Sequence, residues 1–169
     1  MTAARGRTEI TELNRTPREQ FVAALGWIFE DSPWVAERAW RSRPFSGRED
    51  LHQAMVREVE PASHEEQLAL VRAHPDLGAR ARMSAASASE QTGAGLDRMP
   101  PADYESLMAL NSRYRERFGF PFLYAVKGSS SRDLIRALEA RIEALPEEEF
   151  REALRQIYRI AGFRLEGLF

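Results

Sequence analysis

Helix-start signals recur along this sequence, and apolar residues at helical spacing follow each of them. Thr16-Pro17-Arg18-Glu19 has the pattern of a capping box with proline at the first helical position. Phe21, Leu25 and Phe29 follow at the three-to-four-residue spacing of one helix face. Similar signals stand at Ser32-Pro33, Ser46 to Glu49, and Ser63 to Glu66. A chain divided in this way is constrained to short, amphipathic helices.

The second half of the chain has longer helical segments and one apolar stretch without helical spacing. The pattern predicts a helix over 101–118 that Gly119 ends, a helix around 134–142, and a last helix that begins at Pro146. Residues 120–126 are apolar and are expected to be extended. We therefore predict an all-α, single-domain, compact bundle of about seven or eight helices over 16–169, preceded by a flexible tail over 1–15.

Composition narrows the classes of function. The 169 residues are 43% hydrophobic and 30% charged, which is typical of a globular protein, and the net charge of -2 argues against a nucleic-acid partner. The chain has no cysteine, so thiolate chemistry and disulfides are excluded. No apolar run approaches the roughly 20 residues that span a membrane, and the start lacks the apolar core of a secretory signal. We expect a cytoplasmic protein without membrane contact.

His74 is the histidine best placed for chemistry. His52 and His64 belong to predicted helix surfaces, whereas His74 lies in Ala73-His74-Pro75-Asp76-Leu77 at the expected end of a helix. Its ordinary pKa of about 6.5 suits an acid or base at neutral pH. The alternative is a histidine that only caps the helix.

Glu90 has two interpretations as well. Ser87-Ala88-Ser89-Glu90 fits a capping box, in which Ser87 would accept a hydrogen bond from the backbone of Glu90. Glu90 could equally be a catalytic carboxylate. Both roles are compatible, because a cap would hold the carboxylate in place.

The stretch Phe118-Gly119-Phe120-Pro121-Phe122 is dense in aromatic residues. Such density usually indicates core. An extended segment outside any sheet, however, has backbone N–H groups that need partners, and a ligand rich in carbonyl oxygens would supply them.

Four motifs in order resemble one enzyme family. They are His-Pro-Asp-Leu at 74–77, Ser-x-x-Glu-Gln at 87–91, Gly-Ala-Gly-Leu at 93–96 and Phe-Gly-Phe-Pro-Phe at 118–122. Together they resemble the 2-oxo-4-hydroxy-4-carboxy-5-ureidoimidazoline (OHCU) decarboxylase family, and Ile160 to Leu165 resembles its last, arginine-bearing helix. One departure follows Val126-Lys127-Gly128, where the family often has arginine and this chain has Ser129-Ser130-Ser131.

The resemblance implies decarboxylation of OHCU to (S)-allantoin in urate degradation, without cofactor or metal. In this substrate the electrons released with CO2 can enter a neighbouring imine, so the substrate is its own electron sink. The resemblance also implies that His74 is the acid/base residue, that Glu90 is its partner, and that Arg164 binds oxygen through its planar guanidinium. The implied substrate-binding residues are Pro75, Ser87, Gln91, Phe120, Pro121, Phe122, Leu123 and Tyr124.

The same resemblance suggests a homodimer and a functional link to 5-hydroxyisourate hydrolase. Three other functions stay open at this point. A metal hydrolase would use the histidines, but the chain has no His-x-x-x-His spacing. A protein-interaction module would show a large exposed apolar groove. A family member with an altered substrate would differ only by assay.

Overall fold

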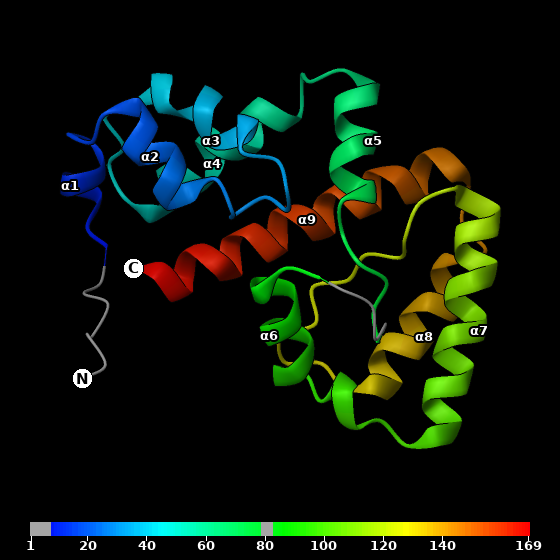
Figure 1. The fold of residues 1–169 in the computed structure, drawn as a ribbon. Helices are drawn as coiled ribbons and strands as arrows, with labels where there is room; N and C mark the ends of the chain where they lie inside the picture. The colour runs from blue at the N-terminus through cyan, green and yellow to red at the C-terminus, as the bar shows by residue number, and fades with distance from the viewer. Residues whose placement is uncertain (1–7, 79–82) are drawn as a thin grey trace, which may run out of the picture. The chain divides into compact units, whose positions relative to one another are not determined.

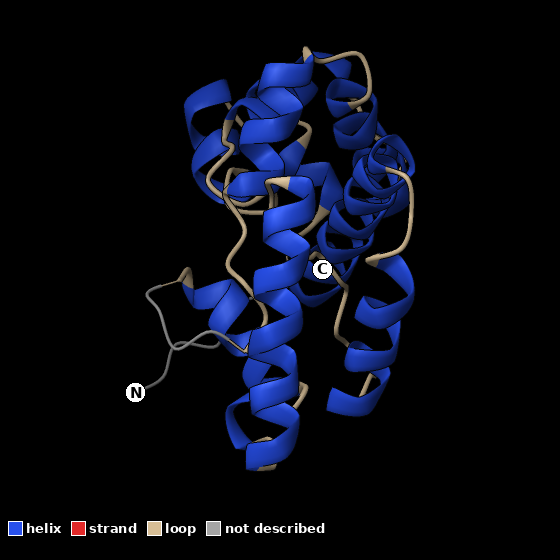
Figure 2. Ribbon diagram, turned by 90° about the vertical axis from the view of Figure 1, so that its right-hand side faces the viewer, coloured by secondary structure: helices blue, strands red, loops and turns tan. Residues whose placement is uncertain are grey.

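The structure, a computed structural model, describes residues 8–78 and 83–169. These residues form nine α-helices and two short 3-10 helices, and this part of the chain contains no strand (Figure 2). The prediction of an all-α fold is therefore confirmed, with slightly more helices than the seven or eight expected. The chain divides into two compact units, Met1–His64 with Ile160–Phe169, and Glu65–Arg159.

The first unit consists of short helices from the start of the chain and the end of the last helix (Figure 1). Its core contains Phe21, Leu25 and Leu51, each with an exposure of 0%. Phe21 stacks on Phe45 with ring centroids 6.1 Å apart. The elements are α1 (Ile10–Leu13), α2 (Arg18–Leu25), α3 (Trp34–Ala39), η1 (Trp40–Ser42), α4 (Arg48–Val59) and the end of α9 (Pro146–Leu168).

The second unit contains the longer helices. Its elements are α5 (His64–Arg72), α6 (Ala85–Gly93), η2 (Leu96–Arg98), α7 (Pro101–Phe118), α8 (Ser131–Arg141) and the first part of α9. α7 and α8 pack side by side (Figure 1). Leu107 and Tyr114 from α7 and Leu138 from α8 are fully buried, which is the outcome expected for apolar residues at helical spacing.

Glycine ends α7 as predicted. Gly119 has φ +78°, a left-handed conformation that glycine adopts without steric penalty, and its N–H donates to the Arg115 carbonyl at 2.8 Å. Residues 121–126 then run without helix or strand, in agreement with the predicted apolar segment. At the departure from the family pattern, Ser130 and Asp133 form a reciprocal capping box that begins α8.

Two predicted capping boxes are wrong. The Thr16 hydroxyl donates to the Glu12 carbonyl at 2.8 Å, so it ends α1 and does not cap α2. At α6 the cap is Ser84, which accepts from the Ser87 N–H at 3.1 Å. Ser87 and Glu90 consequently lie inside α6. Local sequence could not decide, because Ser84 and Ser87 are both suitable caps three residues apart.

Part of the predicted tail is helical. Leu13 of α1 is buried, and the Asn14 side chain bonds the backbone N–H and carbonyl of Phe45 at 2.7 and 2.9 Å. The first seven residues lie outside the described residues, so flexibility of the extreme N-terminus stays a prediction. Among the described helices, none has the length and apolar character needed to cross a membrane.

Candidate active site

His74 lies two residues beyond the end of α5, with only 6% of its surface exposed. Its Nδ1 is 2.9 Å from the carbonyl oxygen of Leu70. A carbonyl can only accept, so Nδ1 must carry the hydrogen, and Nε2 is the basic nitrogen of the neutral ring. The bond satisfies a carbonyl of the last helical turn. The capping interpretation is therefore correct, and Nε2 is the ring nitrogen that this bond does not use.

Side chains from α7 hold the loop after His74. The Asn111 Nδ2 donates to the Leu77 carbonyl at 2.9 Å, and Arg115 donates to the Asp76 carboxylate at 3.0 Å. Asn111 is 6% exposed, and its Oδ1 has no hydrogen-bond partner among the described residues. Sequence analysis missed Asn111. Its signal was a polar residue between Leu107 and Tyr114 on an apolar helix face.

α6 carries the other predicted polar residues of the site. Ser87 and Gln91 are buried, with exposures of 5% and 7%, and Glu90 is half-buried. Positions three and four residues apart share a helix face, so these three side chains project from the same side of α6. The packed side of this helix is therefore polar, which is unusual for a structural helix.

Gln91 connects α6 to the loop that follows His74. Its Oε1 accepts the Gly78 N–H at 2.9 Å in a buried bond. Because a backbone N–H can only donate, this bond fixes the orientation of the amide and makes Nε2 the donor available to a ligand. Gln91 also lines a cavity of about 360 Å³, with Gly78, Met83, Ala88, Thr92, Leu96, Asp97, Met99 and Tyr104.

The aromatic segment after α7 is core, as one of the two interpretations predicted. Phe120, Pro121, Phe122 and Leu123 are buried, and Tyr124 is half-buried. The Tyr114 ring lies edge-on to Phe120 and Phe122, with centroid distances of 5.9 and 5.3 Å. Edge-to-face contacts of this kind stabilise a core beyond the burial of area. The backbone of the segment is thus held rigidly.

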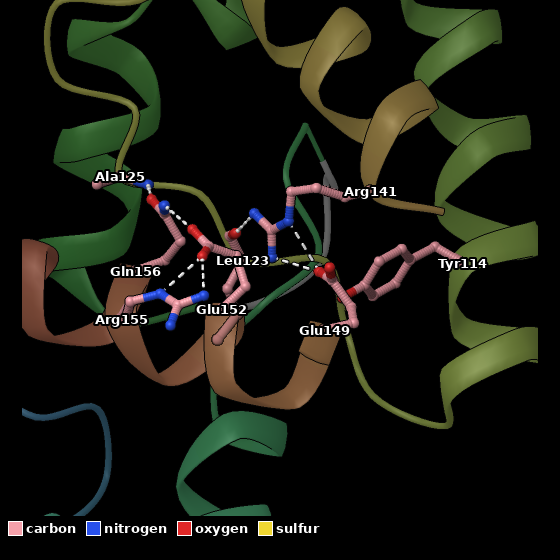
Figure 3. Close-up of polar contacts among 8 residues, drawn as sticks. All are labelled: Tyr114, Leu123, Ala125, Arg141, Glu149, Glu152, Arg155 and Gln156. Carbon is pink, nitrogen blue, oxygen red and sulfur yellow. Dashed lines mark hydrogen bonds and ion pairs between the residues drawn. The ribbon is translucent and has the colours of Figure 1, made fainter. Parts of the chain in front are cut away.

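Two polar side chains fix the backbone on either side of Tyr124 (Figure 3). Arg141 donates to the Leu123 carbonyl at 2.5 Å, and Gln156 accepts the Ala125 N–H at 2.9 Å. In the described part of the chain, no hydrogen bond reaches the backbone N–H of Tyr124. Some backbone groups of this segment are therefore bonded to side chains, whereas the N–H of Tyr124 is not.

Arg141 is held by a buried carboxylate. Its Nε and Nη2 lie 2.8 and 2.5 Å from Glu149 Oε1, and the Tyr114 hydroxyl donates to the same oxygen at 2.5 Å (Figure 3). Burial, together with the hydrogen bond to Glu149, raises the pKa of the Tyr114 hydroxyl, so this group stays protonated. Sequence analysis missed this trio because its members come from three different helices.

Arg164 belongs to the other compact unit and is described by its own contacts. Its Nη2 pairs with the Glu30 carboxylate at 2.8 Å, and its Nη1 donates to the carbonyls of Trp27 and Ile28 at 3.1 and 3.3 Å. Both charged side chains are only 3% exposed. A buried arginine paired in this way has a fixed guanidinium plane.

The remaining histidines differ in their exposure. His64 is exposed at the start of α5, as predicted, whereas His52 is half-buried, with its ring against the backbone of Gly162. Within residues 8–78 and 83–169, no group of three histidine, aspartate or glutamate side chains is arranged to hold a metal ion.

Comparison with known proteins identifies relatives of this chain. The family model described as OHCU decarboxylase matches residues 14–166. A 2-oxo-4-hydroxy-4-carboxy-5-ureidoimidazoline decarboxylase of Halalkalicoccus jeotgali is 48% identical over 162 residues, which cover 96% of this chain and 92% of the relative. A uric acid degradation bifunctional protein of Bacillus subtilis is 47% identical over 157 residues, which cover 93% of this chain and 32% of that protein.

A solved structure agrees with these sequence matches. An (S)-allantoin synthase is similar with a TM-score of 0.80 at 30% identity, and the match covers 96% of this chain and 54% of that one. The resemblance inferred from the four motifs is confirmed. Since the family model spans residues 14–166 and the relative from Halalkalicoccus jeotgali matches along nearly its whole length, this chain belongs to the OHCU decarboxylase family, the carboxy-lyases of urate degradation.

Proposed function

We propose that this chain converts OHCU to (S)-allantoin without a cofactor, with His74 as general acid and base and Glu90 as its partner. The substrate has a carboxylate and a hydroxyl on one ring carbon, next to an imine carbon that bears the ureido group. When the bond to the carboxylate breaks, CO2 leaves and the electron pair enters the imine, whose nitrogen takes up a proton from water. The hydroxyl then gives up its proton as a carbonyl forms, and the ureido carbon takes a proton on one face.

The observation that carries the proposal is the hydrogen bond from His74 Nδ1 to the Leu70 carbonyl. It selects one tautomer of the neutral ring and directs proton transfer to Nε2. A general base held in this way can take the hydroxyl proton and return it to carbon. Glu90, half-buried in α6 and one residue from the anchored Gln91, would accept and return a proton in the same reaction.

The other predicted residues are proposed to bind the substrate. Gln91 would donate from Nε2 to the ureido carbonyl, since its Oε1 already accepts the Gly78 N–H. Ser87 lies on the same face of α6 and would contact the same group. Pro75 and the backbone of residues 120–124 would line the ring. Arg164, with its guanidinium oriented by Glu30, would bind anionic or carbonyl oxygen.

The first experiment is an assay with freshly generated substrate, in which circular dichroism follows the chirality of the allantoin formed. The parent chain is expected to form (S)-allantoin faster than spontaneous decay, and exhaustive chelation is expected to leave the rate unchanged. Racemic product at the spontaneous rate would favour the alternative, a family member with a changed substrate or a non-catalytic interaction role.

Two histidine variants test the assignment within the site. His74→Asn is expected to lower kcat by about 10²-fold or more, the usual contribution of an acid–base residue. His64→Asn is the matched control, because His64 is exposed, and its kcat is expected to stay within twofold of the parent. A loss that follows His64 would show that the wrong histidine was assigned.

We further propose that the protein is a cytoplasmic homodimer with a functional link to 5-hydroxyisourate hydrolase. The bifunctional relative in uric acid degradation supports a link to a second activity, because this chain matches only 32% of it. Light scattering of the purified chain tests the dimer, and a monomer at all concentrations would contradict it.

A further inference from the structure

Side chains from two helices bond the backbone of the residues before and after Tyr124. Arg141 of α8 bonds the Leu123 carbonyl, and Gln156 of α9 bonds the Ala125 N–H (Figure 3). Tyr124 lies between these two bonded residues in the chain, and neither Arg141 nor Gln156 bonds its N–H or its carbonyl.

Arg141 cannot easily turn away from this position. Its guanidinium makes two bonds to Glu149 Oε1, and Glu149 is 1% exposed. It also lies over the Phe122 ring, 4.5 Å from the centroid. A planar guanidinium held at several points is pre-organised, so its bond to Leu123 costs little further side-chain freedom.

Gln156 is fixed by a second bond. Its Nε2 donates to Glu152 Oε1 at 2.8 Å, which leaves Oε1 to accept the Ala125 N–H. The side chain is 6% exposed. Arg141 and Gln156 thus act as a neighbouring strand would: Arg141 is the donor to the Leu123 carbonyl, and Gln156 is the acceptor for the Ala125 N–H.

The backbone groups of Phe122 and Tyr124, which Arg141 and Gln156 do not bond, include donors and acceptors. No group in the described part of the chain accepts a hydrogen bond from the backbone N–H of Phe122 or Tyr124. A ureido group carries N–H donors and a carbonyl acceptor in alternation, which is complementary to the edge of an extended chain. This complementarity favours a cyclic ureide as the ligand of that edge.

We infer that Arg141 and Gln156 are positioning residues, which hold the segment so that the Phe122 and Tyr124 backbone binds the substrate. The inference rests on the proposed function and deepens it by naming the residues behind that binding surface. Neither side chain is proposed to contact the reacting atoms. Their loss should therefore weaken binding of substrate and transition state equally.

The test uses Arg141→Lys and Gln156→Met, each compared with Arg136→Lys. A lysine cannot bridge Glu149 and Leu123 through two nitrogens, and methionine keeps the volume of glutamine without its acceptor. Arg136 lies on the same helix as Arg141 and is exposed, and no hydrogen bond or ion pair in the described part of the chain joins it to the segment, so its substitution is a matched control. Turnover kinetics and the dissociation constant of (S)-allantoin are measured for each variant by steady-state assay and titration calorimetry.

Each positioning variant is expected to raise KM and the (S)-allantoin dissociation constant by about tenfold, the size expected for one lost hydrogen bond, with kcat within threefold of the parent. Amide NMR gives an independent readout, because (S)-allantoin should shift the Tyr124 N–H resonance in the parent and less in both variants. Unchanged KM and dissociation constants in variants with lowered melting temperatures would show that the residues only stabilise the fold, and would overturn the inference.

Failure of the positioning role can be distinguished from failure of the proposed function. His74→Asn should lose turnover but keep (S)-allantoin binding, whereas the positioning variants should do the reverse. A parent chain that binds (S)-allantoin without any shift at Tyr124 would refute the positioning role while leaving the decarboxylase intact. A parent that neither turns over OHCU nor binds (S)-allantoin would refute the proposed function itself.

Discussion

Gly78 joins the loop after His74 to α6, and replacing it with alanine should destabilise the protein more than the same change at Gly95. Both glycines are left-handed, with φ +74° and +76°. A Cβ at position 78 would lie 2.8 Å from Leu107 Cδ2 and 2.9 Å from Met99 Cε, whereas no atom of the described residues lies within 4 Å of one at position 95. Comparison of the two variants therefore separates the free-energy cost of a left-handed alanine from the cost of the steric clash at position 78.

The magnitudes follow from these contacts. A left-handed alanine costs roughly 1–2 kcal/mol, and the stiffer unfolded chain offsets about 0.4–1 kcal/mol of this cost. Gly95→Ala should thus lower the free energy of unfolding by about 1 kcal/mol. Met99 Cε is the end of a flexible side chain and can move, but Leu107 is fully buried, so Gly78→Ala should cost about 1–2 kcal/mol more.

Thermal and urea unfolding, followed by circular dichroism, measure both variants against the parent. In a chain of this size about 1 kcal/mol corresponds to about 2–4 °C, so Gly95→Ala should lower Tm by about that amount and Gly78→Ala by about 5–10 °C. Gly78→Ala should also raise KM, because its N–H positions Gln91. Equal losses of stability at the two positions would refute the packing argument, and no loss at Gly95 would refute the strain argument.

Three further predictions concern capping and charge. Glu90→Gln should reduce kcat by roughly 10²-fold with Tm nearly unchanged, because an amide cannot relay a proton and the residue is not part of a cap; full activity would remove Glu90 from the mechanism. Ser84→Ala should cost about 1 kcal/mol in urea unfolding, whereas Ser87→Ala should lose no cap, and the reverse order would contradict the observed start of α6. Hydrogen bonds from Ser130 lower the pKa of Asp133, so its carboxylate stabilises the fold above the unfolded pKa and ceases to do so as the pH falls through the lowered value. The Tm difference between the parent and Asp133→Asn should therefore be constant above roughly pH 5 and shrink as the pH falls below about 3.9, and a constant difference at all pH values would exclude this carboxylate as the cause.

The sequence alone determined most helix boundaries, because the residues that set them act locally. Pro75 ends α5 by restricting the residue before it, Pro101 begins α7, and Gly119 ends α7 in a left-handed conformation. Such effects depend on neighbours within one helical turn. They fail where two local solutions compete, as with Ser84 and Ser87 before α6.

The motifs in the sequence also identify the family and the candidate residues His74 and Glu90 without reference to the tertiary structure. The motifs do not show which groups these residues contact. The residues around His74 in the sequence predict that it lies at a helix end. The buried bond between its Nδ1 and the Leu70 carbonyl, which selects its tautomer, is seen only in the folded structure.

Only the tertiary structure decided which polar residues hold the segments of the site. Asn111 bonds Leu77, 34 residues away in the chain, and Gln156 bonds Ala125, 31 residues away. On a helix wheel each is only a polar residue near an apolar face, and that pattern does not name its partner. Burial makes the pairing necessary, because an unpaired polar group in the core is costly, but only packing determines which two groups meet.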